Sequence, residues 1–390
     1  MTMDFRLVTR AAAAIAGTVM LVVPAVTHAQ GQGYGRVSGS IEQLYDSNLF
    51  AMPSSSSVPP PSDWITRFGP LFEAGYRSEP LNLRAHYGFD AERHRDLVEL
   101  DNVFARQNAG STLTYKGRTW GAELNGEFVN TQSPTDLNLE TLRFVGQSRA
   151  QRIASSEAFT FDLSPVTSLK VDHGFTRDTL EGGVTSVANV GRLRVSRRMS
   201  ERTTVRADYR PGFTDFSNSR QERSHVGTGG LVHAFTPVLD IEIDGGVRST
   251  SGDIDPEISA LMRHRMRQGA VAVRYVQTRE TTIGEGASLQ IRRLAGEVSY
   301  TPTRAIALTV SPARASSGGT LSSDVVYIVD VQSRFRATRR WSIVAFGRFG
   351  QQERTLPTTD EVNYRTVSLK TVVTLGNLER EREDAETETR

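Results

Sequence analysis

Apolar and polar residues alternate along most of the chain with a period of two. In one such segment, Val205 and Ala207 alternate with Arg206 and Asp208. The same alternation recurs in 81–90, 120–128, 239–248 and 325–336. Successive side chains of a β-strand point to opposite faces, so this pattern predicts long strands with one apolar face. Beyond the first 29 residues, no segment of comparable length shows the helical period.

Two kinds of connection separate the predicted strands. Tight turns are predicted at 78–80, 116–118, 164–167, 199–202, 236–237, 277–280, 301–303 and 337–340. Longer polar loops are predicted at 46–62, 94–100, 131–148, 179–186, 214–222, 251–262, 315–322 and 353–361, with a short connection near 284–286. With a first strand over 33–45 and a last over 362–375, the count is about 18 strands, and 16 is the alternative.

This organisation predicts an all-β fold, a transmembrane antiparallel up-and-down β-barrel. An even number of strands, with short turns at one end and long loops at the other, is typical of outer-membrane barrels. Lipid offers no hydrogen bonds, so a sheet that spans a membrane must close on itself. Aromatic residues such as Trp64, Trp120 and Trp341 stand near strand ends, as in interfacial girdles. The rival β-propeller should show regular blade motifs, and none is present.

Composition narrows the function classes. The 390 residues include no cysteine, which excludes disulfides and thiolate chemistry. The net charge of +2 gives no argument for a nucleic-acid partner. The mean hydropathy of −0.35, taken alone, indicates a soluble protein.

The chain divides into three predicted parts. Residues 1–29 have a positive start, an apolar core and small residues before Gln30, the pattern of a Sec-type signal peptide. Residues 30–376 form the predicted barrel, and 377–390 a charged, disordered tail. We therefore expect the mature protein in the bacterial outer membrane, surrounded by its lipids.

Charged residues fall in register on the face opposite the apolar one, so they are predicted to line the lumen. Both signs are interleaved, which favours either cross-strand ion pairs or a hydrated wall for a polar cargo. The predicted lumen residues are Arg67, Glu73, Arg84, Asp90, Glu123, Glu127, Asp172, Arg194, Arg206, Asp208, Arg210, Asp240, Glu242, Asp244, Arg248, Arg274, Glu297, Asp330, Arg334 and Arg348.

No motif predicts an enzyme. The seven histidines form no ligand pair with a carboxylate cluster, so no metal or catalytic site is predicted. Gly31, Gly33 and Gly35 precede a strand rather than a helix and do not form a phosphate loop. No cofactor is expected.

Several short motifs resemble a known family. They are YDSNLF at 45–50, SDWITR at 62–67 followed by Pro70, LSPVTSL at 163–169 and YTPTR at 300–304. Across roughly 30–376 the chain resembles the outer-membrane β-barrel proteins of exopolysaccharide loci, the β-barrel porin 2-type. The resemblance implies export of, or association with, extracellular polysaccharide, and supplies no catalytic residues. Many barrels end on a terminal aromatic residue; here Leu375 is followed by Gly376 and the charged tail.

Three functions follow as hypotheses. The first is an outer-membrane channel or component for exopolysaccharide export, with polysaccharide as cargo and periplasmic polysaccharide-export proteins as partners. The second is a general diffusion porin for small polar solutes. The third is a non-conducting surface barrel that binds polysaccharide, which a plugged lumen would favour.

Overall fold

The computed structural model describes residues 31–318, 323–355 and 359–376. The predicted signal peptide and charged tail lie outside these residues. The described residues form eighteen long strands and two short 3-10 helices, η2 (Val98–Leu100) and η3 (Pro134–Leu137). No helix among them is long and apolar enough to cross a membrane.

The strands follow one another around a single sheet. They are β1 (Gln32–Asp46), β2 (Asp63–Arg77), β3 (Leu81–His94), β4 (Asn102–Lys116), β5 (Trp120–Thr131), β6 (Ala150–Ser164), β7 (Thr167–Leu180), β8 (Ser186–Arg198), β9 (Thr203–Phe216), β10 (Gln221–Thr236), β11 (Leu239–Thr250), β12 (Asp253–Met266), β13 (Gly269–Thr281), β14 (Ser288–Thr303), β15 (Ile306–Gly318), β16 (Ser323–Arg336), β17 (Trp341–Thr355) and β18 (Thr359–Gly376).

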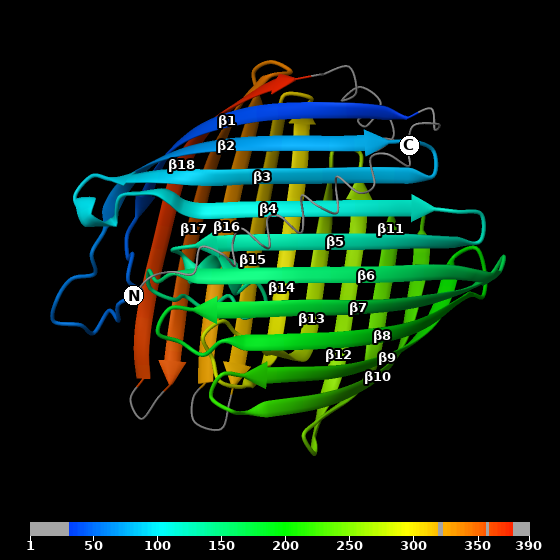
Figure 1. Cartoon of the computed structure of the whole chain (residues 1–390). Helices are drawn as coiled ribbons and strands as arrows, with labels where there is room; N and C mark the ends of the chain where they lie inside the picture. The colour runs from blue at the N-terminus through cyan, green and yellow to red at the C-terminus, as the bar shows by residue number, and fades with distance from the viewer. Residues whose placement is uncertain (1–30, 319–322, 356–358, 377–390) are drawn as a thin grey trace.

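Each strand pairs antiparallel with its neighbours in the chain, and β1 pairs with β18 as well as β2. The sheet is therefore a closed barrel with no free edge (Figure 1). This closure satisfies the backbone hydrogen bonds of every strand inside the sheet, as a lipid surrounding requires. The predicted fold and the count of 18 strands are confirmed.

The outer face of the barrel is mainly apolar. Ile41, Phe68 and Val310 belong to a large set of exposed apolar side chains on strands around the whole sheet. Their sequence neighbours Glu42, Arg67 and Ser311 point to the interior, where they line cavities. The period-two pattern therefore separates an apolar exterior from a polar interior.

Three predicted connections are wrong in position. Residues 301–303 belong to β14, and the tight turn after that strand is at 304–305. Residues 277–280 belong to β13, and the tight turn before that strand is at 267–268. Residues 253–262, predicted as part of a loop, belong to β12. Residues 277–280 are all polar, whereas polar residues alternate with apolar ones over 253–259, and strand pairing continues through both stretches, for example between Ile258 and Gln277. Strand pairing therefore extends the β structure beyond the strictly apolar pattern.

Buried apolar residues occur in three small clusters rather than in one core. One joins Leu44, Leu49 and Ile65, a second joins Leu137, Ala150 and Ile283, and a third joins Phe144, Val326 and Ile328. The second and third clusters join the loop between β5 and β6 to other parts of the barrel. Apolar packing inside the barrel thus serves mainly to hold this loop.

Candidate functional site

The loop between β5 and β6, residues 132–149, folds into the barrel. It begins with η3, which contains Asp136, and returns to the wall at Ala150. Because β14 is nine strands from β5 in either direction around the ring of eighteen, contacts between this loop and β14 reach the opposite wall. We call residues 132–149 the internal loop.

Polar contacts fasten the internal loop to that opposite wall. Arg293 of β14 donates to the carbonyl of Leu139 at 2.8 Å and pairs with Glu140 at 3.0 Å. Arg143 pairs with Asp324 of β16 at 2.9 Å and also with Glu285. The loop therefore has charged anchors on several elements of the far wall.

Phe144 provides the apolar anchor. Its side chain is 1% exposed and packs against Val326 and Ile328 of β16. Its ring stacks on Tyr364 of β18 with centroids 4.9 Å apart, and its amide donates to the side chain of Gln352 at 2.8 Å. A buried phenylalanine with these partners fixes the loop across the interior instead of leaving it in solvent.

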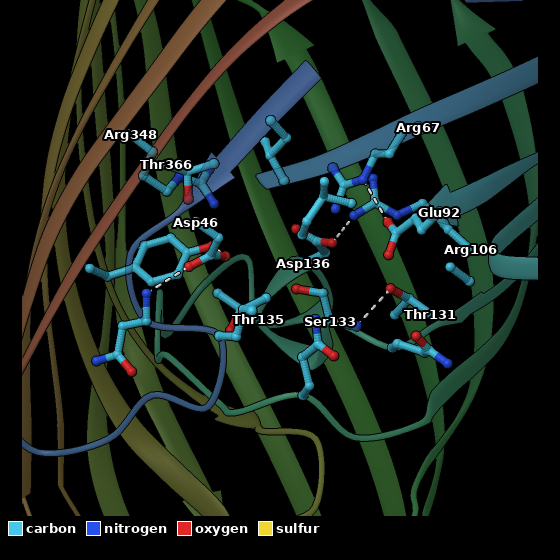
Figure 2. A pocket seen from close by; sticks show the side chains of 18 of the residues that line it. Asp46, Arg67, Glu92, Arg106, Thr131, Ser133, Thr135, Asp136, Arg348 and Thr366 are labelled. Carbon is cyan, nitrogen blue, oxygen red and sulfur yellow. Dashed lines mark hydrogen bonds and ion pairs between the residues drawn. The ribbon is translucent and has the colours of Figure 1, made fainter. Parts of the chain in front are cut away.

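A first interior cavity, of about 290 Å³, lies between the internal loop and the wall formed by β1–β4, β17 and β18. Figure 2 shows this cavity with Asp136 of the internal loop facing Arg106, with which it forms an ion pair. Arg67 donates to Glu92 at 2.6 Å beside it, and Arg348 lies on the other side. The cavity is lined mainly by polar and charged groups.

A second interior cavity, of about 480 Å³, lies between the internal loop and the wall formed by β12–β17. Asp136 and Arg348 line both cavities, so Asp136 lies where the two meet. Arg263 and Arg274 also line the second cavity, and among the described residues neither has an ion-pair partner. This part of the interior therefore offers guanidinium groups to a solute.

Cross-strand register locates the residues that the sequence predicted in the lumen. Partners in a ladder share a face, and the chain of partners is continuous around the barrel from Glu42 through Arg67 and Glu92 back to Lys370. On this inner face lie Arg67, Glu73, Arg84, Asp90, Glu123, Glu127, Asp172, Arg194, Arg206, Asp208, Arg210, Asp240, Glu242, Asp244, Arg248, Arg274, Glu297, Asp330, Arg334 and Arg348. Their part in a solute pathway stays a prediction.

Most of these charges are joined in ion-pair groups. Asp208 accepts from Arg192 and Arg194, both at 2.7 Å. The other groups are Arg67 with Glu42 and Glu92, Arg36–Glu73–Arg84, Arg206 with Glu242 and Asp244, Arg210–Glu257–Arg248, Arg265–Asp240 and Arg348–Asp330. Each group joins two or more strands, so the interior charges contribute to cross-strand pairing as well as to hydration of the wall.

The remaining charges lie on opposite walls of the interior. Among the described residues, Glu123, Glu127 and Asp172 of β5–β7 form no ion pair, and on the far side neither do Arg274 and Arg334 of β13 and β16. Glu297 of β14 on that far side, and Lys170 of β7 beside the three acids, form no ion pair among the described residues either, so each wall keeps uncompensated charge of both signs. A polar solute between them meets both signs.

Sequence reasoning missed the internal loop. The sequence pattern predicts a long polar loop over 131–148 and does not indicate Asp136, Arg143, Phe144 or Arg293 as site residues. Leu137, Leu142 and Phe144 within that stretch were the available signal, because a solvated loop has little need of large apolar residues. No group of three or more His, Asp or Glu residues that could hold a metal occurs in the part of the chain that the structure describes.

These features define the class of protein. A closed antiparallel sheet with an apolar exterior and a charged interior is a transmembrane β-barrel of the kind found in bacterial outer membranes.

No family model matches the chain, and no curated protein does either. Solved structures of similar fold include Acinetobacter baumannii OccAB4, with a TM-score of 0.47, 8% identity and coverage of 89% of this chain and 98% of that one. They also include Pseudomonas aeruginosa OpdK with vanillate, with a TM-score of 0.48, 10% identity and coverage of 88% and 99%. A third is Pseudomonas aeruginosa OccK11 (OpdR), with a TM-score of 0.48, 11% identity and coverage of 88% and 98%. The resemblance to exopolysaccharide-locus barrels stays a prediction.

Proposed function

We propose that this barrel is an outer-membrane channel for small polar solutes, with the internal loop as its constriction. The observation that carries this proposal is the path of the internal loop from β5 across the interior. The loop contacts Arg293 of β14, and its Phe144 packs against β16 and β18. The two cavities beside the loop, about 290 and 480 Å³, are of the size that holds a small ligand, for which about 300–1,000 Å³ is usual. Their charged lining supplies hydrogen bonds to a hydrated solute.

Export of exopolysaccharide is the finer hypothesis, and the internal loop bears on it directly. A continuous polymer chain would have to pass beside the loop, or displace the loop and its anchors. Displacement would expose Phe144 and separate Arg143 from Asp324. The geometry therefore favours small solutes, and polysaccharide cargo with periplasmic export partners requires a loop that moves.

Blocking the constriction chemically tests the proposal. The chain has no cysteine, so Asp136→Cys places a single thiol where the two interior cavities meet. We expect a bulky, membrane-impermeant thiol reagent to reduce the single-channel conductance of this variant in planar bilayers. Ser219→Cys, in the β9–β10 connection, is the matched control and should bind the reagent without a change in current.

Two results would overturn the proposal. One is a reconstituted, correctly folded barrel that carries no ion current before modification. The other is an Asp136→Cys current that stays unchanged although mass spectrometry shows complete labelling, because the pathway would then avoid the internal loop.

A further inference from the structure

A third cavity, of about 750 Å³, lies on the outer face of the barrel at the loop ends of β3–β6. Gln107, Asn130 and Gln151 are direct cross-strand partners on β4, β5 and β6, and all three line it. Gln107 follows Arg106, which points inward to Asp136, and Gln151 precedes Arg152, which donates inward to the carbonyl of Leu137 at 3.1 Å. Alternation therefore places the row of amides on the outer face.

Other polar side chains occur on the outer face near the loop ends, such as Gln351 and its cross-strand partner Asn363 on β17 and β18, but the row of three amides borders a cavity. An amide carries two donor hydrogens and an acceptor oxygen, and leaving them without partners away from water is costly. Asn130 donates to Gln107 at 3.4 Å and accepts from Arg149 at 3.3 Å. The side-chain amide of Gln151 has no partner among the described residues, and the buried Oε1 of Gln132, at the same cavity, has none either. Hydrogen-bonding capacity is therefore left for a ligand.

Aromatic side chains form the apolar part of the same cavity. Tyr87 and Phe104 line it, with 40% and 48% of their surfaces exposed, and both contact Phe89, at 6.3 and 5.2 Å between ring centroids. Phe128 lies two residues before Asn130 in β5, so both side chains point to the outer face. Aromatic rings beside amides suit an amphipathic ligand, because the rings contact C–H groups and the amides bind hydroxyl groups.

Sugars have this combination of apolar C–H faces and hydroxyl edges. We propose that the outer cavity binds the sugar headgroup of a membrane glycolipid at the loop end of the barrel. A glycolipid is favoured over a free saccharide because Tyr87 and Phe128 in the lining continue into the apolar outer face of β3 and β5, along which acyl chains can lie. The inference rests on the membrane placement in the proposed function, and not on the channel activity.

Lipid retention by the purified full-length barrel tests the inference. The probes are lipid A bearing a core oligosaccharide, and the same oligosaccharide freed of lipid A. We expect native mass spectrometry to show the glycolipid on the detergent-solubilised wild-type barrel. The double variant Gln107→Leu/Gln151→Leu should bind it about tenfold more weakly, since two hydrogen-bonding side chains are lost. Leucine on the outer face should not impair insertion.

Asn189→Leu is the matched control, because Asn189 is an outward amide on β8, between Phe175 and Phe213, that does not line the cavity. This variant should retain the glycolipid as the wild type does. Equal loss in the control and the double variant would overturn the inference, as would a wild-type barrel that conducts but retains no glycolipid. Binding of the lipid-free oligosaccharide as tight as that of the glycolipid would also overturn it. A barrel that fails to insert into bilayers would instead contradict the proposed function.

Discussion

At the scale of single residues, the interior charges differ in how many partners depend on them. The carboxylate of Asp208 is 2% exposed and is shared by Arg192 and Arg194, on the neighbouring strand β8. Removing it leaves two guanidinium groups on the inner wall without their acceptor. A single substitution there changes the charge that a solute meets by more than the loss of an isolated surface carboxylate would.

We expect Asp208→Ala to move the ion selectivity of the reconstituted channel toward anions, because the inner wall loses one negative charge and two arginines are released. Reversal potentials in a salt gradient measure the selectivity. Glu157→Ala is the matched control: it removes the same charge on the outer face, where Glu157 contacts His173 at 2.9 Å. An identical shift in both variants would mean that interior location does not matter.

Facing direction gives a second prediction at this scale. Val310 and Ser311 are neighbours in β15, so they lie at nearly the same depth but on opposite faces. Val310→Arg should impair barrel assembly, because an arginine on the lipid face costs about 2–4 kcal/mol at the bilayer midplane and less toward the interfaces. Ser311→Arg should assemble normally, since Ser311 lines the second interior cavity and lies opposite Asp330, its cross-strand partner on β16. Heat-modifiable migration in detergent reports the folded fraction, and equal loss for both variants would refute the assigned register.

At the scale of elements, strands could be predicted and the internal loop could not. Alternation such as that of Val205 and Arg206 is local, so it locates a strand without knowledge of its neighbours. The path of residues 132–149 depends on contacts more than one hundred residues away in sequence, such as Arg143 with Asp324. No local pattern encodes those partners. That Arg206 and Arg348 face the interior could be predicted from the sequence. The carboxylate that each of them contacts could not, because that depends on strand register and on closure of the barrel.

The internal loop is also the element whose release should change function most. We expect Phe144→Ala to loosen it, because truncating a buried phenylalanine removes about 3–5 kcal/mol of packing. The result should be a larger and noisier single-channel conductance with an intact barrel. Leu139→Ala is the control within the same loop, because Leu139 is 64% exposed and its carbonyl, not its side chain, binds Arg293. A conductance that is the same in Phe144→Ala and the wild type would show that the loop does not limit the current.

At the scale of the whole molecule, orientation follows from the two kinds of connection. Because the number of strands is even, the start of β1 and the end of β18 lie on the side of the tight turns. Outer-membrane barrels direct that side to the periplasm. An epitope tag at Ser56, in the long connection after β1, should be accessible on intact cells, and a tag at Gly117, in a tight turn, should not. Labelling at Gly117 alone would reverse the orientation.

The most direct test of the central claim measures what passes through the intact barrel. Proteoliposomes containing the wild-type protein are placed in solutions of neutral saccharides of increasing length, and the rate of swelling reports permeation. Because the internal loop crosses the interior, with cavities of about 290 and 480 Å³ beside it, we predict entry of mono- and disaccharides and exclusion of long oligosaccharides. Free passage of polymer through the wild-type barrel, or exclusion of even the smallest sugars, would contradict the claim.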